Sequence, residues 1–216
     1  MIRSKRLGSG AGIVLALAAF HPMHANAADP AGPDFLSPAP IASDPIWAVT
    51  VFAGVSGGGN DLHELFYKPW LADGDDYLWG GASVSRHLAR FWTHFTIEAE
   101  VGVGHRFGPE YTASEAWVAG YLRYDGFPWN EFVKTSVAVS TGLNVIDRLP
   151  EEEKSRSDDA RSHVLHYFSP EITFAHPDYS NHEFVIRYHH RSGVAGVFNG
   201  VWGGSNVIAL GYRHRW

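Results

Sequence analysis

From residue 46 to the end of the chain, apolar and polar side chains alternate with a period of two. The alternation is clearest over 91–103, where the odd positions are mainly apolar and the even positions include Glu98 and Glu100. Successive side chains of a β-strand point to opposite faces, so the pattern predicts strands with one apolar and one polar face. The 3.6-residue period of an amphipathic helix is almost absent.

Clusters of Gly, Pro, Asn and Asp divide this region into eight segments, an even number. The segments fall at 46–55, 76–88, 91–104, 114–123, 131–142, 164–175, 183–191 and 205–216. Each is long enough for a tilted membrane-crossing strand, which takes roughly 9–11 residues. The chain therefore has the strand count of a small antiparallel barrel.

The connections between the segments differ in length. We expect long or medium connections at 56–75, 105–113, 143–163 and 192–204, and short ones at 89–90, 124–130 and 176–182. Bacterial barrels place short turns on the periplasmic side and long loops outside. If both termini lie in the periplasm, every longer connection falls on the outer side.

The last segment favours the same topology. It sets Arg213 and Arg215 opposite an apolar face made of Ile208, Leu210, Tyr212 and Trp216. A final aromatic residue is typical of outer-membrane barrels. We therefore predict an all-β fold, an eight-stranded antiparallel transmembrane β-barrel over 46–216 that is apolar outside and charged inside, in the outer membrane of a bacterial cell.

The interior of such a barrel should collect the charged side chains of its strands. We expect the lumen to hold Arg86, Glu98, Glu100, Glu115, Arg123, Arg187 and Arg213. Eight strands enclose a space that side chains can fill, so we do not expect a wide pore. The eight tryptophans should lie at the membrane interfaces or in the core, because indole is amphipathic.

The N-terminal residues have the pattern of an export signal. A basic start, an apolar core and an Ala25-Asn26-Ala27 cleavage site predict a signal peptide over 1–27. Five prolines follow before residue 46, which predicts an extended periplasmic arm over 28–45. The apolar core of about ten residues is well short of the ~20 that a transmembrane helix needs.

Composition excludes several partners and sites. Lys and Arg number 17 against 23 Asp and Glu, and removing Arg3, Lys5 and Arg6 with the leader leaves 14 against 23, a net charge of −9. A nucleic-acid partner is therefore not expected. The chain has no cysteine, which excludes disulfides and thiolate chemistry. The histidines lack the spacing of a metal site, so we expect no metal and no cofactor.

Candidate chemistry is concentrated near the end of the seventh segment, in the run Arg-Tyr-His-His-Arg-Ser-Gly over 187–193. Residues two apart on a strand share a face, so His190 and Ser192 lie side by side with the spacing that a serine and its general base can use. Both continue the apolar face that includes Phe184 and Ile186. They should therefore face lipid rather than lumen, and at the outer end that lipid is lipopolysaccharide.

This region, mainly 183–216, resembles the lipid A 3-O-deacylase family of eight-stranded outer-membrane esterases. The family carries a His-x-Ser pair near the end of the penultimate strand and an acidic residue on the last strand. The resemblance implies that Ser192 is the nucleophile, that His190 is its general base, and that Asn206 stands at or beside the position of the acid.

The chain departs from the family at two positions. Asn206 can orient an imidazole but offers no negative charge to the imidazolium, so we expect a slower enzyme or none. The family usually has an Asn after the serine that helps to hold the oxyanion, and this chain has Gly193. Backbone N–H groups around Gly193 and Gly196 are expected to take its place.

The register of the final hairpin decides whether the site forms. If His190 faces Asn206, the connection is a wide loop. A tight turn at Asn199-Gly200 would instead set Ala209 opposite His190 and dismantle the site.

Two functions of different classes follow. The first is an outer-membrane serine esterase that removes an ester-linked acyl chain from lipid A, with lipopolysaccharide as its partner. The second is a catalytically inactive or non-enzymatic barrel with a structural or surface-interaction role, which Asn206 favours. The sequence leaves a homodimer in the membrane open.

Overall fold

The computed structural model describes residues 46–56, 77–155 and 161–216, so the expected signal peptide, arm and Trp70 lie outside the described residues. The strands are β1 (Trp47–Ser56), β2 (Leu78–Phe91), β3 (Phe95–Phe107), β4 (Thr112–Tyr124), β5 (Lys134–Ile146), β6 (Val164–Phe168), β7 (Glu171–Ala175), β8 (His182–Ser192) and β9 (Gly204–Arg215). The described parts of the connections hold a short helix, α2 (Glu151–Ser155), and a 3-10 helix, η2 (Pro177–Tyr179). In this part of the chain, no helix is long and apolar enough to cross a membrane.

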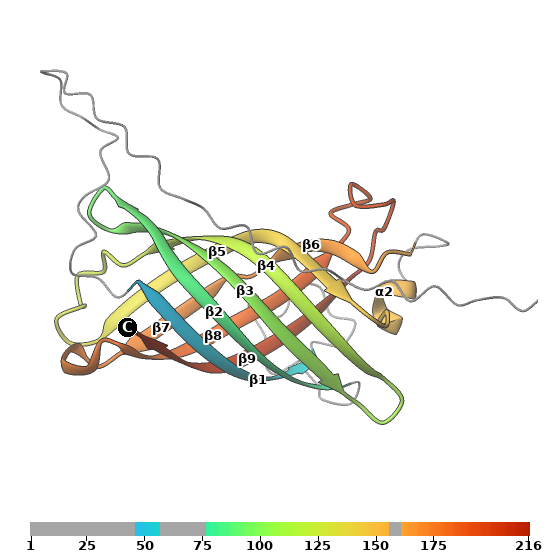
Figure 1. The fold of residues 1–216 in the computed structure, drawn as a ribbon, viewed down its shortest axis with the longest axis horizontal. Helices are drawn as coiled ribbons and strands as arrows, with labels where there is room; N and C mark the ends of the chain where they lie inside the picture. Colours follow the sequence, from blue (N-terminus) through green and yellow to red (C-terminus); the bar gives the residue numbers. More distant parts are fainter. Residues whose placement is uncertain (1–45, 57–76, 156–160) are drawn as a thin grey trace, which may run out of the picture. The chain divides into compact units, whose positions relative to one another are not determined.

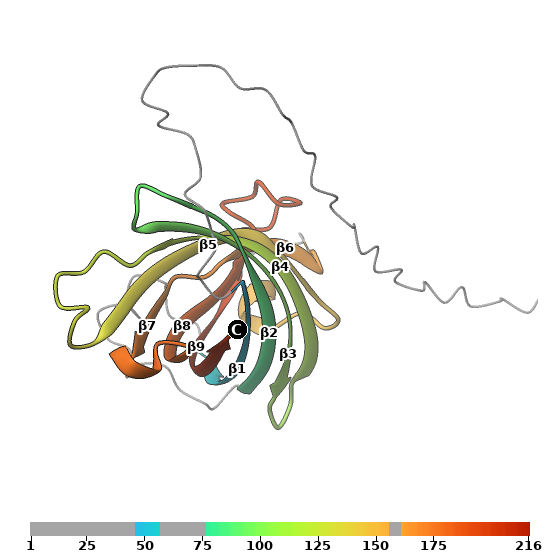
Figure 2. The same cartoon turned by 60° about the vertical axis from the view of Figure 1, so that its left-hand side comes forward.

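The strands close into an antiparallel barrel (Figures 1 and 2). Neighbouring strands pair in chain order, and β9 pairs with β1 to complete the ring. β6 and β7 are two pieces of one wall strand between β5 and β8, because Pro170 has no N–H to donate and Ser169 donates its N–H to the Ser140 hydroxyl at 2.8 Å instead. The described segments therefore form the predicted eight-stranded barrel.

Each strand has an inner and an outer face, and the alternation follows the sequence. On β1, Thr50 and Phe52 point inward and are buried, whereas Val49 and Val51 point outward and are exposed. The other strands repeat this pattern, so the outer wall is lined by Val, Leu, Ile and aromatic side chains. An apolar outer surface around a charged interior is the arrangement of a membrane barrel.

The two ends of the barrel differ. The end that holds Trp47 and Trp216 is called the terminal end, and its connections are 92–94, 125–133 and 176–181. The opposite end is called the loop end, and its fully described connections are 108–111 and 193–203. The predicted long connection at 56–75 lies outside the described residues except for Ser56, and so do 156–160 of the predicted connection at 143–163. In Figure 1 the C-terminus marks the terminal end at the left, and α2 lies at the loop end.

Two predicted connection lengths are wrong. The expected medium loop at 105–113 is the tight connection 108–111, because pairing between β3 and β4 continues to Phe107 and Thr112. The expected short turn at 124–130 is the longer 125–133, in which the Asn130 side chain bonds the backbone of Asp125 and Thr135. The length of a connection therefore does not always predict the end of the barrel at which it lies.

The start of the third strand is also later than predicted. The structure ends β2 at Phe91 and begins β3 at Phe95. Between them Trp92 and Thr93 have φ values of 46° and 63°, which make a turn rather than a strand. Residues 92–94 of the predicted strand therefore belong to this turn, and Phe91 is the last residue of β2.

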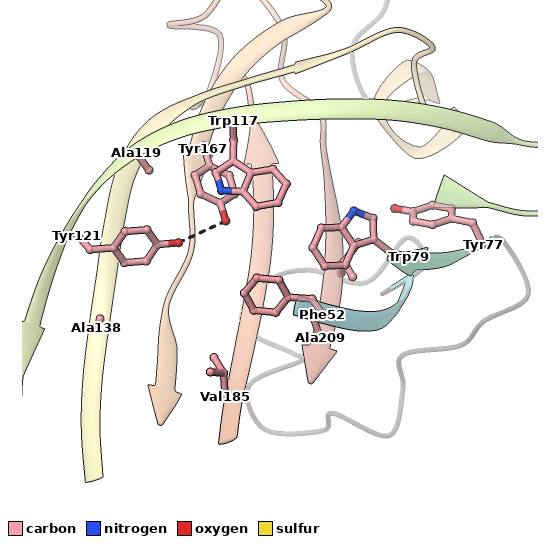
Figure 3. Close-up of a cluster of buried hydrophobic side chains, with 11 residues drawn as sticks. Phe52, Tyr77, Trp79, Trp117, Ala119, Tyr121, Ala138, Tyr167, Val185 and Ala209 are labelled. Atoms are coloured by element: carbon pink, nitrogen blue, oxygen red, sulfur yellow. Dashed lines mark hydrogen bonds between the residues drawn. The ribbon is translucent and has the colours of Figure 1, made fainter. Parts of the chain in front are cut away.

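Aromatic side chains fill the middle of the lumen (Figure 3). Trp79 and Trp117 lie with ring centroids 6.0 Å apart, and Tyr121 and Tyr167 bring their hydroxyls to 3.4 Å. These two tryptophans belong to the core, whereas Trp47, Trp92, Trp129, Trp202 and Trp216 are exposed. The interior is therefore filled by side chains, as expected for eight strands.

Ion pairs fill the rest of the lumen. Glu171 accepts hydrogen bonds from Arg123, Arg187 and Arg213, and Arg187 also binds both carboxylate oxygens of Glu100 at 2.8 Å. All of these side chains are buried. Six of the seven charged residues predicted in the lumen lie there.

Arg86 is the exception, and its predicted place in the lumen is wrong. It pairs with Trp47 in the sheet, points outward, and sets its guanidinium 5.3 Å from the Trp47 ring. Its neighbour His87 points inward and is buried. The strand's alternation, and not the charge of the side chain, decides the face.

Candidate active site

The predicted site lies on the outer wall, where β8 reaches the loop end. Along β8, Arg187, His189 and Arg191 are buried in the lumen, whereas His190 and Ser192 lie on the opposite, outer face. Both are half-buried. The structure therefore places the predicted pair toward the lipid side of the wall.

His190 is held by a residue of the last strand. The register sets His190 opposite Asn206, and the His190 Nδ1 to Asn206 Oδ1 distance is 2.6 Å. A carboxamide oxygen can only accept, so Nδ1 donates and Nε2 keeps its lone pair. Tyr188 packs beside the imidazole, with ring centroids 6.1 Å apart. His190 is thus held in the tautomer that a general base requires.

Ser192 lies two residues along from His190 on the same face. No hydrogen bond joins the Ser192 hydroxyl to His190 among the residues that the structure describes. Catalytic hydrogen bonds are often long or poorly aligned without substrate and tighten when it binds. The structure therefore shows a base held by Asn206 and a hydroxyl beside it, not yet a bonded dyad.

The final connection is a wide loop, as the first of the two expected registers requires. The residues 193–203 fold back on themselves through backbone bonds such as Phe198 N–H to Gly193 O at 2.9 Å and Gly200 N–H to Gly196 O at 3.0 Å. Asn199 and Gly200 do turn with positive φ. They turn within the loop, so they do not set the strand register.

The two backbone donors expected for an oxyanion are occupied. Gly193 donates its N–H to Gly203 O at 3.1 Å, and Gly196 donates to Val201 O at 3.0 Å. Neither N–H is turned toward a substrate in this conformation. Gly193 has a packing reason instead, because a Cβ there would lie 1.9 Å from Val201 O.

The sequence reasoning missed one neighbour of the site. His166 on β6 is the cross-strand partner of Ser192, and its Nε2 lies 2.9 Å from the hydroxyl oxygen of Thr141 on β5. From the sequence it was one of many scattered histidines. The alternation of the sixth segment, in which Val164, His166 and Phe168 share a face, could have placed it outside.

Behind the wall, α2 lies at the loop end and buries its Glu153. Glu153 accepts a hydrogen bond from Ser205 Oγ at 2.8 Å and lies 3.3 Å from Arg191 Nε. Burial raises the pKa of Glu153, and the nearby Arg191 and Arg106 oppose this. These charges face the lumen, so no acidic side chain takes the place of Asn206 on the outer face of the described wall.

Away from this site, the described residues hold a cavity but no metal-ligand cluster. They contain no group of three or more His, Asp or Glu side chains that could hold a metal ion. A cavity of about 700 Å³ opens at the terminal end, where His87, Arg90 and Lys134 are among its lining residues. The central lumen network separates it from His190 and Ser192.

Comparison with known proteins shows the fold. No protein-family model matches the chain, and no curated protein matches it. The crystal structure of the outer membrane enzyme PagL matches with a TM-score of 0.52 and 12% identity, covering 78% of this chain and 99% of that chain. Neisserial surface protein A (NspA) matches with a TM-score of 0.48 and 14% identity, covering 79% and 96%. The N-terminal β-barrel domain of Pseudomonas aeruginosa OprF matches with a TM-score of 0.43 and 10% identity, covering 80% and 98%.

The match to PagL spans nearly the whole of that barrel and most of this chain, and at such low identity it speaks for fold alone. Together with the apolar outer wall and the charged lumen, it confirms the fold and setting expected from the sequence. The chain is a small outer-membrane β-barrel of eight strands.

Proposed function

We propose that this barrel is an outer-membrane serine esterase that removes an ester-linked acyl chain from lipid A. The observation that carries the proposal is the 2.6 Å hydrogen bond between His190 and Asn206, which fixes the basic nitrogen of an outward-facing histidine two residues from a serine. The fold is compatible with such a reaction, since the outer membrane enzyme PagL has a similar one.

The proposed reaction needs only these side chains and water. The Ser192 hydroxyl passes its proton to His190 Nε2 while Oγ bonds to the ester carbonyl carbon, whose π electrons move to oxygen. The tetrahedral intermediate collapses, and the leaving alkoxide takes the proton from His190. Water then attacks the acyl-enzyme with His190 as base, which releases the fatty acid and restores the Ser192 hydroxyl.

The wall below the site suits an acyl chain. Phe184, Ile186 and Leu210 are exposed on the outer faces of β8 and β9, between the site and the terminal end. We place the loop end on the cell exterior, where lipopolysaccharide forms the outer leaflet. A lipid could then present its ester at Ser192 while its chain stays against this apolar wall.

Asn206 sets the expected rate. An acid at this position would stabilise the imidazolium that forms on His190, and a neutral carboxamide does not. The hydrogen bond still selects the productive tautomer, so the loss should be smaller than the ~10⁴-fold seen when a triad Asp becomes an Asn that favours the wrong tautomer. We therefore expect slow turnover.

The test is a change in lipid A that depends on one hydroxyl. The chain is expressed in an outer membrane, lipid A is examined by mass spectrometry, and Ser192→Ala is compared with Ser114→Ala. Ser114 is a matched control, because it also points outward near the loop end but lies on β4, across the barrel.

The expected result is loss of one acyl chain in wild type and Ser114→Ala but not in Ser192→Ala. Intact lipid A in cells that contain folded wild-type barrel would contradict the proposal. It would favour instead a non-catalytic barrel with a structural or lipopolysaccharide-contact role.

A further inference from the structure

Ser192 has two cross-strand neighbours, and they differ sharply. On the β9 side it faces Gly204, which has no side chain, and a Cβ there would lie 2.9 Å from Ser192 Cβ. On the β6 side it faces His166. Directly opposed residues of an antiparallel pair have Cβ atoms roughly 4.5–5.5 Å apart, so the His166 ring is within reach of a group bonded to Ser192.

An ester attacked by Ser192 needs a donor for its oxyanion. Fixed hydrogen-bond donors aimed at that oxygen usually supply the largest single part of catalysis in acyl transfer. The N–H groups of Gly193 and Gly196 are bound to backbone carbonyls, and His190 is already engaged as the base. The side chain that remains beside Ser192 is His166.

The surroundings of His166 hold its ring in place. Its Nε2 contacts the Thr141 hydroxyl at 2.9 Å, and the Phe198 ring lies 5.6 Å away between centroids. When Thr141 donates its hydroxyl proton to Nε2, the neutral imidazole carries its own proton on Nδ1. His166 then has an N–H that no residue of the described wall accepts.

We propose that His166 is a further catalytic residue, whose imidazole N–H donates to the oxyanion that forms when Ser192 attacks an ester carbonyl. The proposal rests on the proposed esterase function and adds a second histidine with a different part in it. No proton is transferred by His166: it donates a hydrogen bond while the negative charge sits on the carbonyl oxygen. Thr141 is a positioning residue, because it acts through His166.

The experiment compares His166→Ala, His166→Gln and a matched control in purified barrel reconstituted with lipid A. Loss of one oxyanion donor typically lowers kcat by about 10²–10³-fold, and we expect that loss in His166→Ala with KM within ~3-fold of wild type. His166→Gln keeps an N–H donor and should recover at least about tenfold. His105→Ala should match wild type, since His105 also points outward and contacts a serine hydroxyl at 3.1 Å, but on β3.

A second pair of variants tests the positioning of the ring. Thr141→Val removes the hydroxyl and should lower kcat by about tenfold, whereas Thr141→Ser keeps it and should restore the rate. This pair also serves if His166→Ala fails to fold, which heat-modifiable mobility on a gel would show. Equal rates for Thr141→Val and wild type would overturn the role of Thr141 in setting the tautomer.

Labelling of Ser192 by an alkyl fluorophosphonate separates failure of this inference from failure of the proposed function. In that reaction the Ser192 hydroxyl passes its proton to His190, Oγ bonds to phosphorus, fluoride leaves, and the phosphoryl oxygen occupies the oxyanion position. If wild type cleaves lipid A and His166→Ala is as fast, the part assigned to His166 is overturned while the esterase stands. If lipid A is not cleaved but labelling still slows with His166→Ala, the donor is supported and the substrate is wrong. If wild type neither cleaves lipid A nor is labelled, both are overturned.

Discussion

Two neighbouring histidines on β8 lie in opposite environments. His189 is wholly buried in the lumen, where its Nε2 lies 3.0 Å from Glu115 and its ring packs against Trp79, Trp117 and Tyr167. His190 is half-buried on the outer wall and donates to Asn206. One ring belongs to a closed polar core, and the other borders on lipid.

Residue type alone therefore does not decide the part that a side chain plays in a barrel. The period of two sends adjacent residues to different solvents, so one histidine is used for stability and the next is available for chemistry. The same reasoning separates Arg187, in the ion-paired lumen, from Arg86, on the outer wall beside Trp47.

The same substitution at the two histidines should give opposite losses. His190→Gln removes the base and should lower deacylation at least ~10³-fold, with the free energy of unfolding within about 1 kcal/mol of wild type. His189→Gln should lower the free energy of unfolding by about 1–3 kcal/mol, because Glu115 loses a buried partner, while the folded fraction keeps its activity. Urea unfolding in vesicles and the lipid A assay measure the two effects. If both variants lost activity and stability together, the two faces would not be separate.

The lumen network should break most severely at Glu171. Glu171→Gln leaves Arg123, Arg187 and Arg213 without a shared carboxylate, and removing one partner of a buried pair costs about 3–5 kcal/mol. Val137 is exposed on the outer wall, so Val137→Thr serves as the control variant for expression and assembly. A midpoint of urea unfolding equal to that of wild type would show that the network contributes little.

Restoring an acid should speed the outer site. Asn206→Asp is close in shape, keeps an oxygen for His190 Nδ1 and adds the negative charge that the imidazolium lacks. We expect kcat to rise by about 10–10²-fold, less than the full triad effect because Asn206 already selects the tautomer. Turnover on lipid A measures the gain. A lower rate in Asn206→Asp than in wild type would show that an acid at this position does not speed the reaction.

The smallest effect concerns α2 at the loop end and its buried Glu153. Burial raises the pKa of Glu153. The Glu153 carboxyl therefore binds a proton more tightly when α2 is packed against the barrel than when α2 is released into water. Docking is therefore most stable below the pKa of a free glutamate and weakens as pH rises through the raised value. Hydrogen exchange of 151–155 should be faster at high pH than intrinsic rates explain, and Glu153→Gln should remove the difference. An unchanged pH dependence in Glu153→Gln would contradict this.

Most of the barrel follows from sequence because its rule is local. Alternation and turn residues indicate eight strands, the lipid-facing side of His190 and Ser192, and six of the seven lumen charges. Arg86 was placed in the lumen because of its charge, although it is two residues from Val84 and therefore shares the outer face with it. An arginine beside Trp47 at a membrane interface is well tolerated.

The site was harder to predict because two of its features are not local. The pairing of Ser192 with His166 joins strands across a connection, and it depends on the register that β6 takes after residue 163. The occupied N–H groups of Gly193 and Gly196 depend on how the loop folds on itself, where Val194 and Ala195 take φ values of 50° and 51°. No sequence period predicts such a loop.

On β8, Ser192 should face lipid, whereas His189 and Arg191 face the lumen. The chain has no cysteine, so a nitroxide on one introduced cysteine reports a single position. Labels at Leu210→Cys, Ser192→Cys and Asn199→Cys in vesicles can be compared by their collision rates with oxygen, which prefers lipid, and with a water-soluble nickel complex. We expect an oxygen-to-nickel ratio that is highest at 210, intermediate at 192 and lowest at 199. A ratio at 192 no higher than at 199 would put the site in water, and Ser192 would then not face lipid.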